Sequence, residues 1–352
     1  MDYLGATGHS SFSRALSWHR ASPGGKSPTV TKDLRHQART SPRQAWSLRL
    51  LAAVTTVLSY LLVVLGDTVR VTNSGMGCRS WPLCNGHLGL TGNLHALLEQ
   101  SHRYLAALVT IMVAATFVAA WRTARLDRLV FRAAAAALGL IGVQVALGAL
   151  TVYAHNASWT VALHLAGAWL VVAVVTVTAT GAWHDGGTGL QLRHSTLAGR
   201  LGVAAAVSLF VLSVTGMLVL HEGASKVCPG WPVCGAGSGP AGLVVLQYVH
   251  RSFALGAGVV IVAAAIRVWR SPLARAVDRA LAVTAALLLA GTAAAGAVVA
   301  TTGAPAPAQA LHLAVATLLW ISVVALATLR PAQGAADPAD AAIGAAGRAL
   351  TR

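Results

Sequence analysis

The fold class of this chain is decided by residues 94–121, which read LHALLEQSHRYLAALVTIMVAATFVAAW. This nearly unbroken apolar run is long enough, as a helix, to cross the hydrocarbon core of a bilayer. Glu99 and His102 lie near its start, three residues apart, so both side chains leave the same face of the expected helix. Ionisable groups are costly inside lipid and usually functional there. The run therefore predicts a membrane-spanning helix with a functional face.

The composition agrees with a membrane protein, since 56% of the residues are apolar and only 10% are charged. That balance excludes an ordinary soluble domain. Seven further apolar runs have spanning length, at residues 47–68, 129–153, 160–183, 200–220, 243–269, 279–302 and 308–329. We therefore expect an all-α polytopic membrane protein with eight transmembrane helices.

The net charge of +16 reflects topology rather than a nucleic-acid partner. Lysine and arginine crowd the N-terminal tail and recur in alternate connections between the apolar runs. The positive-inside rule assigns such connections to the cytoplasm. We expect a multi-pass protein of the cell membrane, in contact with lipid, with both termini cytoplasmic, the cysteine-bearing loops outside and no nucleic-acid partner.

The chain contains an internal repeat, and repeats should be sought before a fold is assigned. Residues 78–84 and 228–234 both read C-x-x-W-P-x-C, 150 residues apart. His102 and His250 are 148 residues apart, as are His164 and His312, and as are Gly148 and Gly296. The unit holds four helices, an even number, so both copies enter the membrane in the same direction. This predicts two parallel, pseudo-symmetric four-helix bundles.

The predicted organisation follows from this repeat and from composition. Residues 1–46 are polar and basic and are expected to be a disordered cytoplasmic tail. Residues 47–183 form the N-terminal four-helix half, residues 184–199 a cytoplasmic linker, residues 200–330 the C-terminal half, and residues 331–352 a cytoplasmic tail.

Four of the thirteen histidines lie clearly within apolar runs: His102, His164, His250 and His312. They occupy the even-numbered runs, about one to two turns from the expected outer ends. Two histidines at similar depth on facing helices are what axial ligation of one haem iron requires. A single buried histidine is more often satisfied by a backbone or hydroxyl group, but four in a repeated pattern favour haem. We therefore expect one iron-ligand pair in each half.

The two halves differ at one informative position, because Glu99 corresponds to Gln247 in the 148-residue register. We interpret the first half as the reaction site, with Glu99 as the catalytic residue, and the second half as the site of a haem that carries electrons. The alternative for Glu99 is a snorkelling or interfacial residue near the outer end of the helix, paired with Arg103. Arg103 and Arg251 follow the ligand histidines and suit haem propionates, lipid headgroups or plain interfacial anchoring, which the sequence does not separate.

The four cysteines are all expected on the outer face, where disulfides persist. Their spacing suggests one disulfide within each loop, Cys78–Cys84 and Cys228–Cys234. We interpret the second pair as a structural staple. A redox or reactive role is more plausible for the first pair, because its loop leads into the Glu99 helix. A four-cysteine zinc site across the two loops is a minor alternative.

Taken together, these residues resemble the heme A synthase family (the CtaA group). The resemblance covers residues 47–330. It rests on the segment from Val69-Arg70-Val71-Thr72 through Ser74-Gly75 to Cys78-x-x-Trp81-Pro82-x-Cys84, on Glu99-x-x-His102-Arg103, on Gln144-x-x-Leu147-Gly148-Ala149-Leu150-Thr151-Val152, on His164-Leu165, on His250-Arg251 and on His312.

The resemblance implies an oxidoreductase that acts on a CH group. It would oxidise the C8 methyl of heme O to the formyl group of heme A, which is needed for terminal oxidase assembly. His102 and His164 would flank the iron of the substrate heme O, with Glu99 toward the ring edge that bears the methyl. His250 and His312 would ligate haem b as the cofactor. Expected partners are a heme O synthase, a membrane electron acceptor and terminal oxidase assembly factors, and a homo-oligomer is left open.

Two other functions account for part of the pattern. A non-catalytic diheme b-type electron-transfer protein explains the four histidines, but not a glutamate in one half only or the paired loop cysteines. A transporter built from parallel repeats, with Glu99 and the histidines as a proton relay, predicts a protein without haem.

Overall fold

The computed structural model describes residues 42–89, 92–123, 128–183, 197–235, 239–272 and 274–328 of the chain. Most of the predicted tail 1–46, nearly all of the predicted linker 184–199 and the whole of the predicted tail 331–352 lie outside these residues. All the helices belong to one compact unit.

The described residues form eight long helices and no strand. In chain order these are α1 (Pro42–Val71), α2 (Leu94–Thr123), α3 (Arg128–Tyr153), α4 (Ser158–Trp183), α5 (Leu197–His221), α6 (Ala241–Arg270), α7 (Ala276–Thr301) and α8 (Ala306–Thr328), with a short 3-10 helix η2 (Ala224–Lys226) after α5. Each of the eight is long and apolar enough to cross a membrane. The predicted all-α, eight-span fold is therefore confirmed.

The turns that end α3 and α7 are built in the same way. His155 and Asn156 adopt positive φ angles of 52° and 55°, and the residues 148 positions later, Gly303 and Ala304, have φ angles of 76° and 58°. Asn156 N–H donates to the carbonyl of the residue five positions before it at 2.8 Å, and Ala304 N–H does the same at 2.8 Å. This six-to-one bond closes the last helical turn. The sequence repeat thus extends to backbone conformation.

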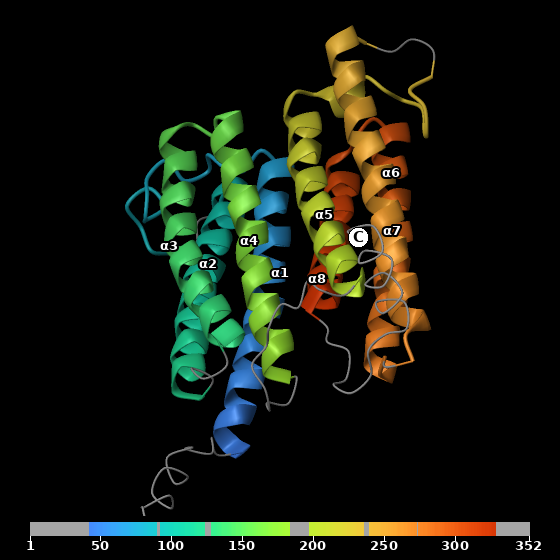
Figure 1. Ribbon diagram of the computed structural model, residues 1–352. Coiled ribbons are helices and arrows are strands. Elements are labelled where there is room, and N and C mark those ends of the chain that lie inside the picture. The colour runs from blue at the N-terminus through green and yellow to red at the C-terminus, as the bar shows by residue number, and fades with distance from the viewer. Residues whose placement is uncertain are drawn as a thin grey trace, which may run out of the picture. The chain divides into compact units, whose positions relative to one another are not determined.

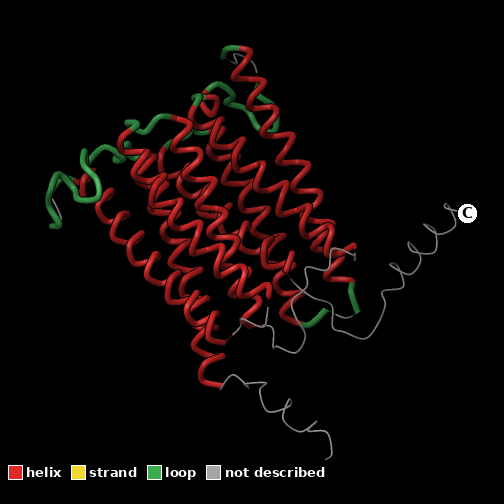
Figure 2. Tube along the Cα trace, turned by 60° about the vertical axis from the view of Figure 1, so that its left-hand side comes forward, coloured by secondary structure: helices red, strands yellow, loops and turns green. Residues whose placement is uncertain are grey.

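Within each half the helices pack in the same neighbour order. In the first half α1 and α3 each contact both α2 and α4, and in the second half α5 and α7 each contact both α6 and α8. Figure 1 shows α1 to α4, in blue to green, on one side and α5 to α8, in yellow to red, on the other. The loops that follow α1 and α5 lie at one end of the bundle (Figure 2). Matching neighbours agree with a repeat, although the pseudo-symmetric relation of the two halves stays a prediction.

The two halves meet mainly where α8 packs against α1 and α4. The rings of Trp169 on α4 and Trp320 on α8 stack with centroids 5.3 Å apart, and both residues are almost fully buried. The Trp320 Nε1–H donates to the Trp169 carbonyl at 2.9 Å. The hydroxyls of Thr180 and Thr328, which are 148 residues apart, lie 2.9 Å from each other. Equivalent positions of the repeat therefore touch across the junction.

The outward helix faces are apolar, unlike those of a soluble bundle. Large side chains such as Ile111, Leu255 and Leu287 are 64%, 72% and 68% exposed. Exposed apolar surface spread over many helices is unfavourable in water and favourable in lipid. The chain is a multi-pass membrane protein.

Candidate functional site

Each of the four intramembrane histidines faces a glycine on a neighbouring odd-numbered helix. A Cβ placed on the glycine would approach the histidine Cε1 to 2.9 Å, 3.5 Å, 3.1 Å and 3.1 Å in the pairs Gly66–His102, Gly148–His164, Gly216–His250 and Gly296–His312. Glycine lets the ring lie close against the backbone of the next helix, where a larger residue would displace it. We call the space beside each of these glycines, where a Cβ would lie, a glycine notch. Four matching glycine notches therefore hold the four rings.

The structure brings the histidines together in the predicted pairs. His102 and His164 are near enough to interact electrostatically, and so are His250 and His312. Among the described residues, no group of three or more His, Cys, Asp or Glu side chains could hold a metal ion. Two histidines per half suit a haem iron, because the porphyrin supplies its remaining equatorial ligands.

In the C-terminal half a hydrogen bond at Nδ1 fixes the orientation of each histidine ring. His312 Nδ1 lies 3.1 Å from the Thr292 carbonyl, which can only accept, so Nδ1 carries the proton. His250 Nδ1 lies 3.2 Å from Thr215 Oγ1, and that hydroxyl donates its own proton to the Leu212 carbonyl at 2.8 Å. Both rings therefore present an unprotonated Nε2, which is the form that binds iron.

The N-terminal half lacks these fixed contacts. The buried Nδ1 atoms of His102 and His164 make no hydrogen bond of good geometry within the described part of the chain. The Leu62 carbonyl of α1 faces the His102 ring without closing such a bond. Each half thus has its own pair of histidines, but the rings are oriented less firmly in the N-terminal half than in the C-terminal half.

Glu99 is buried and bound to the loop that precedes its helix. Its Oε1 accepts from Arg103 Nη2 at 2.6 Å, and its Oε2 accepts from the Cys78 backbone N–H at 2.8 Å. The residue is only 4% exposed. The pairing with Arg103, one alternative from sequence, is present, although it is a buried pair and not a snorkelling one. At the equivalent place Gln247 Nε2 donates to the Ala224 carbonyl at 3.0 Å, without a charge.

The two arginines clamp the cysteine loops. Arg103 donates from Nη1 to the Ser80 carbonyl at 2.7 Å and from Nη2 to the Cys78 carbonyl at 3.2 Å. Arg251 donates from Nη1 to the Pro232 carbonyl at 2.9 Å. These contacts were not foreseen from the sequence, and the predicted propionate contacts of both arginines stay predictions.

Each cysteine loop holds its own disulfide, as predicted. Cys78 is bonded to Cys84 and Cys228 to Cys234, and the described residues include no free cysteine. A zinc site that uses the four sulfurs is therefore excluded. All four cysteines are at most 2% exposed, and thiol–disulfide exchange requires access to the sulfur. Burial favours a static role for both bonds.

Three features near the histidines were missed from sequence. Gly66 and Gly216 are 150 residues apart, as the cysteines are, so the repeat could have revealed them as an equivalent pair. Nothing in the sequence predicted that they would contact histidines. Asp67 pairs with Arg70 at 2.7 Å, and Arg70 reaches Gln309 on α8 at 3.4 Å. Gln144, noted only within a motif, is buried on α3 one turn before Gly148, the glycine that faces His164.

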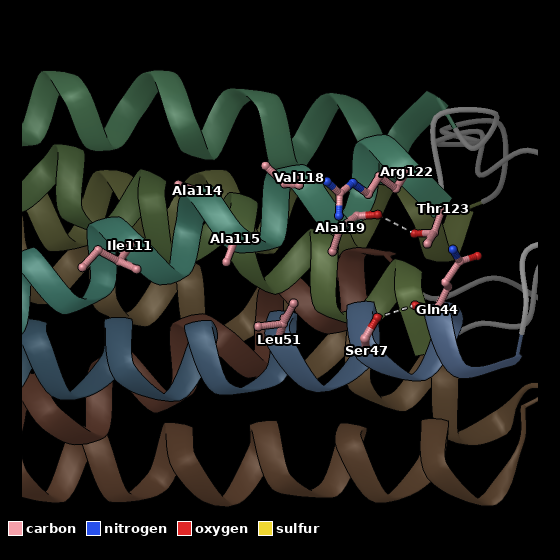
Figure 3. Close-up of a pocket in the computed structure, with 10 residues that line it drawn as sticks. All are labelled: Gln44, Ser47, Leu51, Ile111, Ala114, Ala115, Val118, Ala119, Arg122 and Thr123. Atoms are coloured by element: carbon pink, nitrogen blue, oxygen red, sulfur yellow. Dashed lines mark hydrogen bonds between the residues drawn. The ribbon is translucent and has the colours of Figure 1, made fainter.

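A groove on the bundle lies elsewhere, between the ends of α1 and α2 that are remote from the cysteine loops (Figure 3). It has a volume of about 530 Å³ and is lined by Gln44, Ser47, Leu51, Ile111, Ala114, Ala115, Val118, Ala119, Arg122 and Thr123. It contains no histidine, so it is separate from both ligand pairs.

Comparison with known families decides what these features belong to. The model of the COX15-CtaA family, described as cytochrome oxidase assembly protein, matches residues 49–100 and 91–324. The chain belongs to the COX15-CtaA family. The matched residues include both cysteine loops and all four histidines.

Individual relatives of the chain include proteins named heme A synthase. The chain is 32% identical over 225 residues to a protein of Geobacillus thermodenitrificans named heme A synthase, covering 61% of this chain and 69% of that protein. It is 29% identical over 263 residues to a heme A synthase of Symbiobacterium thermophilum, covering 70% and 84%. A shorter match of 106 residues, 38% identical, joins 30% of this chain to 24% of a protoheme IX farnesyltransferase of Halobacterium salinarum.

Proposed function

We propose that this protein is a heme A synthase, an oxidoreductase that converts the C8 methyl of heme O into the formyl group of heme A for terminal oxidase assembly. The observation that carries the proposal is that each half holds two buried histidines, each packed against a glycine of the next helix, in a chain of the COX15-CtaA family. Relatives of this chain bear the name heme A synthase.

We assign the substrate to the N-terminal half, residues 47–183. In this assignment His102 and His164 flank the heme O iron. Glu99, one helical turn before His102, lies toward the ring edge that bears the C8 methyl. Two observations support this assignment. Glu99 is buried where the other half has a neutral amide. The His164 Nδ1 has no hydrogen-bond partner within the described residues, which suits a ligand that must enter and leave.

We assign a resident haem b to the C-terminal half, residues 200–330, with His250 and His312 as its ligands. The residues fit this group because both rings are held with Nε2 unprotonated by Thr215 and the Thr292 carbonyl. When bound, the haem supplies one-electron transfer. A fixed ligand set suits a cofactor that stays in place through many turnovers.

The reaction requires two successive two-electron oxidations of the methyl carbon. Each oxidation replaces one C–H bond by a C–O bond to a water oxygen, releases two protons and passes two electrons to a membrane electron acceptor. The first gives an alcohol and the second a hydrated aldehyde, which loses water to give the formyl group. The Glu99 carboxylate accepts hydrogen bonds on both oxygens, so it is held in place as a fixed negative charge. Such a group stabilises positive charge that develops on the substituent, without reorganisation during the reaction.

The partners and the orientation follow from this role. Heme O has to come from a heme O synthase, and the partial likeness to a protoheme IX farnesyltransferase supports a link to that step. We further propose a membrane electron acceptor, delivery to oxidase assembly factors, a location in the cell membrane, cytoplasmic termini and outer cysteine loops. The alternate basic connections support this orientation.

The proposal is tested by haem extraction from a host that makes heme O but no heme A. Expression of this chain is expected to produce heme A and to lower heme O, as measured by chromatography of extracted haems. Unchanged heme O with no heme A would overturn the proposal. A protein purified without any haem would instead favour a transporter. A protein with bound haem but no product would favour the diheme electron carrier, which explains neither the buried Glu99 nor the names of the relatives.

A further inference from the structure

Gln144 on α3 is a buried amide without a hydrogen-bond partner. The residue is 7% exposed, and neither its Oε1 nor its Nε2 has a partner within the described residues. A buried polar group without a hydrogen bond is destabilising, more so in a membrane, and native structures rarely leave both ends of an amide unpaired. A side chain of this kind indicates a ligand that supplies the missing contacts.

The amide lies one helical turn from the proposed substrate ligand. Gln144 and Gly148 are four residues apart and share a face of α3, while His164 and Gly167 are three apart and share a face of α4. The Gly148 notch faces the His164 ring, with 3.5 Å from its Cβ position to Cε1. On the next turn, away from the cysteine loops, the Gly167 Cβ position falls against Gln144 Nε2. Glycine at 167 therefore makes room for the amide beside the haem ligand.

The C-terminal half has no such amide. The residue 148 positions after Gln144 is Thr292, whose hydroxyl donates to the Leu288 carbonyl at 2.7 Å and whose carbonyl meets His312 Nδ1. The residue 148 positions after Gly167 is Val315. The unpaired amide and the glycine beside it thus belong only to the half assigned to the substrate.

The chemistry of the amide selects its partner. It offers N–H donors and a carbonyl acceptor and carries no charge, which matches a hydroxyl group that both accepts and donates. A propionate only accepts and would leave Oε1 unpaired, and vinyl and methyl groups make no hydrogen bond. Heme O carries a hydroxyethylfarnesyl group where protohaem has a vinyl group. We propose that Gln144 hydrogen-bonds this hydroxyl and thereby selects heme O over protohaem, an inference that rests on the proposed function.

The test compares two ligands on purified, haem b-loaded protein. Heme O and protohaem are each titrated into wild type and Gln144→Leu, and binding is followed by the Soret band. Loss of this buried contact is expected to weaken heme O binding about tenfold or more. Protohaem binding should stay equal or become tighter, since the vinyl group never paired with the amide. Gln247→Leu, the same change at a buried amide of the other half that contacts the Ala224 carbonyl, is the matched control and should not change the ratio of the two affinities.

Other outcomes overturn the inference. Equal weakening of both ligands would make Gln144 a packing residue, and no change in either would remove it from recognition. Unchanged heme O binding with release of the C8 alcohol would mean that Gln144 binds the reaction intermediate. Retained haem b absorbance reports folding, and Gln144→Thr, which copies the other half, replaces Gln144→Leu if that variant is unstable. Heme A formation by the wild type is measured separately, so failure of the proposed function is seen on its own.

Discussion

At the scale of single residues, the carboxylate of Glu99 has two tasks. It anchors the first cysteine loop through the Cys78 N–H, and it places a negative charge one turn from His102. Its counterpart Gln247 anchors the second loop through the Ala224 carbonyl with a neutral amide. Loop anchoring therefore does not require a charge, and the charge itself is the feature specific to the proposed reaction half.

Glu99→Gln should keep the bond from the Cys78 N–H, since the amide oxygen accepts it. It should lose the charge and with it the bond from Arg103, because the amide nitrogen cannot accept from the guanidinium. Heme A formation is expected to fall about a hundredfold or more, the scale seen when one preorganised electrostatic group is removed. Haem should remain bound. Product is measured by haem extraction and bound haem by the pyridine haemochrome spectrum.

The matched control is Gln247→Leu, which removes the anchor of the other loop and should leave heme A formation close to normal. Heme A production at the wild-type rate by Glu99→Gln would remove Glu99 from the catalytic role. Loss of bound haem together with product would show that the residue acts mainly through folding.

At the scale of helices, the decisive unit is a glycine on one helix facing a histidine on the next. The glycine allows the two helices to approach closely, and the close approach fixes the position of the histidine ring that would bind the iron. Because the same unit occurs four times, at α1–α2, α3–α4, α5–α6 and α7–α8, the ligand geometry is a property of helix pairs.

Gly216→Val should displace His250, because even a Cβ at this position lies only 3.1 Å from the ring. Overpacking of this kind destabilises by about 1–3 kcal/mol, and the expected result is loss of haem b from the C-terminal half. The control is Gly256→Val on α6, where a Cβ meets nothing within 4 Å. Haem content per purified protein is measured, and full occupancy in Gly216→Val would contradict the notch.

At the scale of the whole molecule, the two halves form one packed body. A continuous apolar core includes Val63 and Trp169 from the first half with Leu319 and Trp320 from the second. Side chains at the ends that carry the cysteine loops also connect the halves, since Arg70 on α1 reaches Gln309 on α8. We infer that each half depends on the other for its stability.

Trp320→Ala should therefore weaken both histidine pairs together. It removes the stacked ring and the bond to the Trp169 carbonyl, and truncation of a buried tryptophan typically destabilises by about 3–5 kcal/mol. Thermal unfolding in detergent is followed by haem absorbance and by helix content, and one shared transition at lower temperature is expected. Trp121→Ala, at a residue that is 53% exposed, is the control. Two separate transitions would show that the halves unfold independently.

The sequence by itself determined the eight helices, the four-histidine repeat, the disulfide within each loop and the single-sided Glu99. The helices follow from local hydropathy and the disulfides from the six-residue spacing of each cysteine pair. The histidine repeat and the unmatched Glu99 follow from the 148-residue offset between the two halves. Only the tertiary structure decided that Glu99 and Arg103 hold the first loop, that glycines seat the four rings, and that Gln144 is unpaired beside His164. The physical reason is that these helices are apolar on nearly every face. Their periodicity therefore does not reveal which residues meet across a helix pair, and close approach is set by packing in three dimensions.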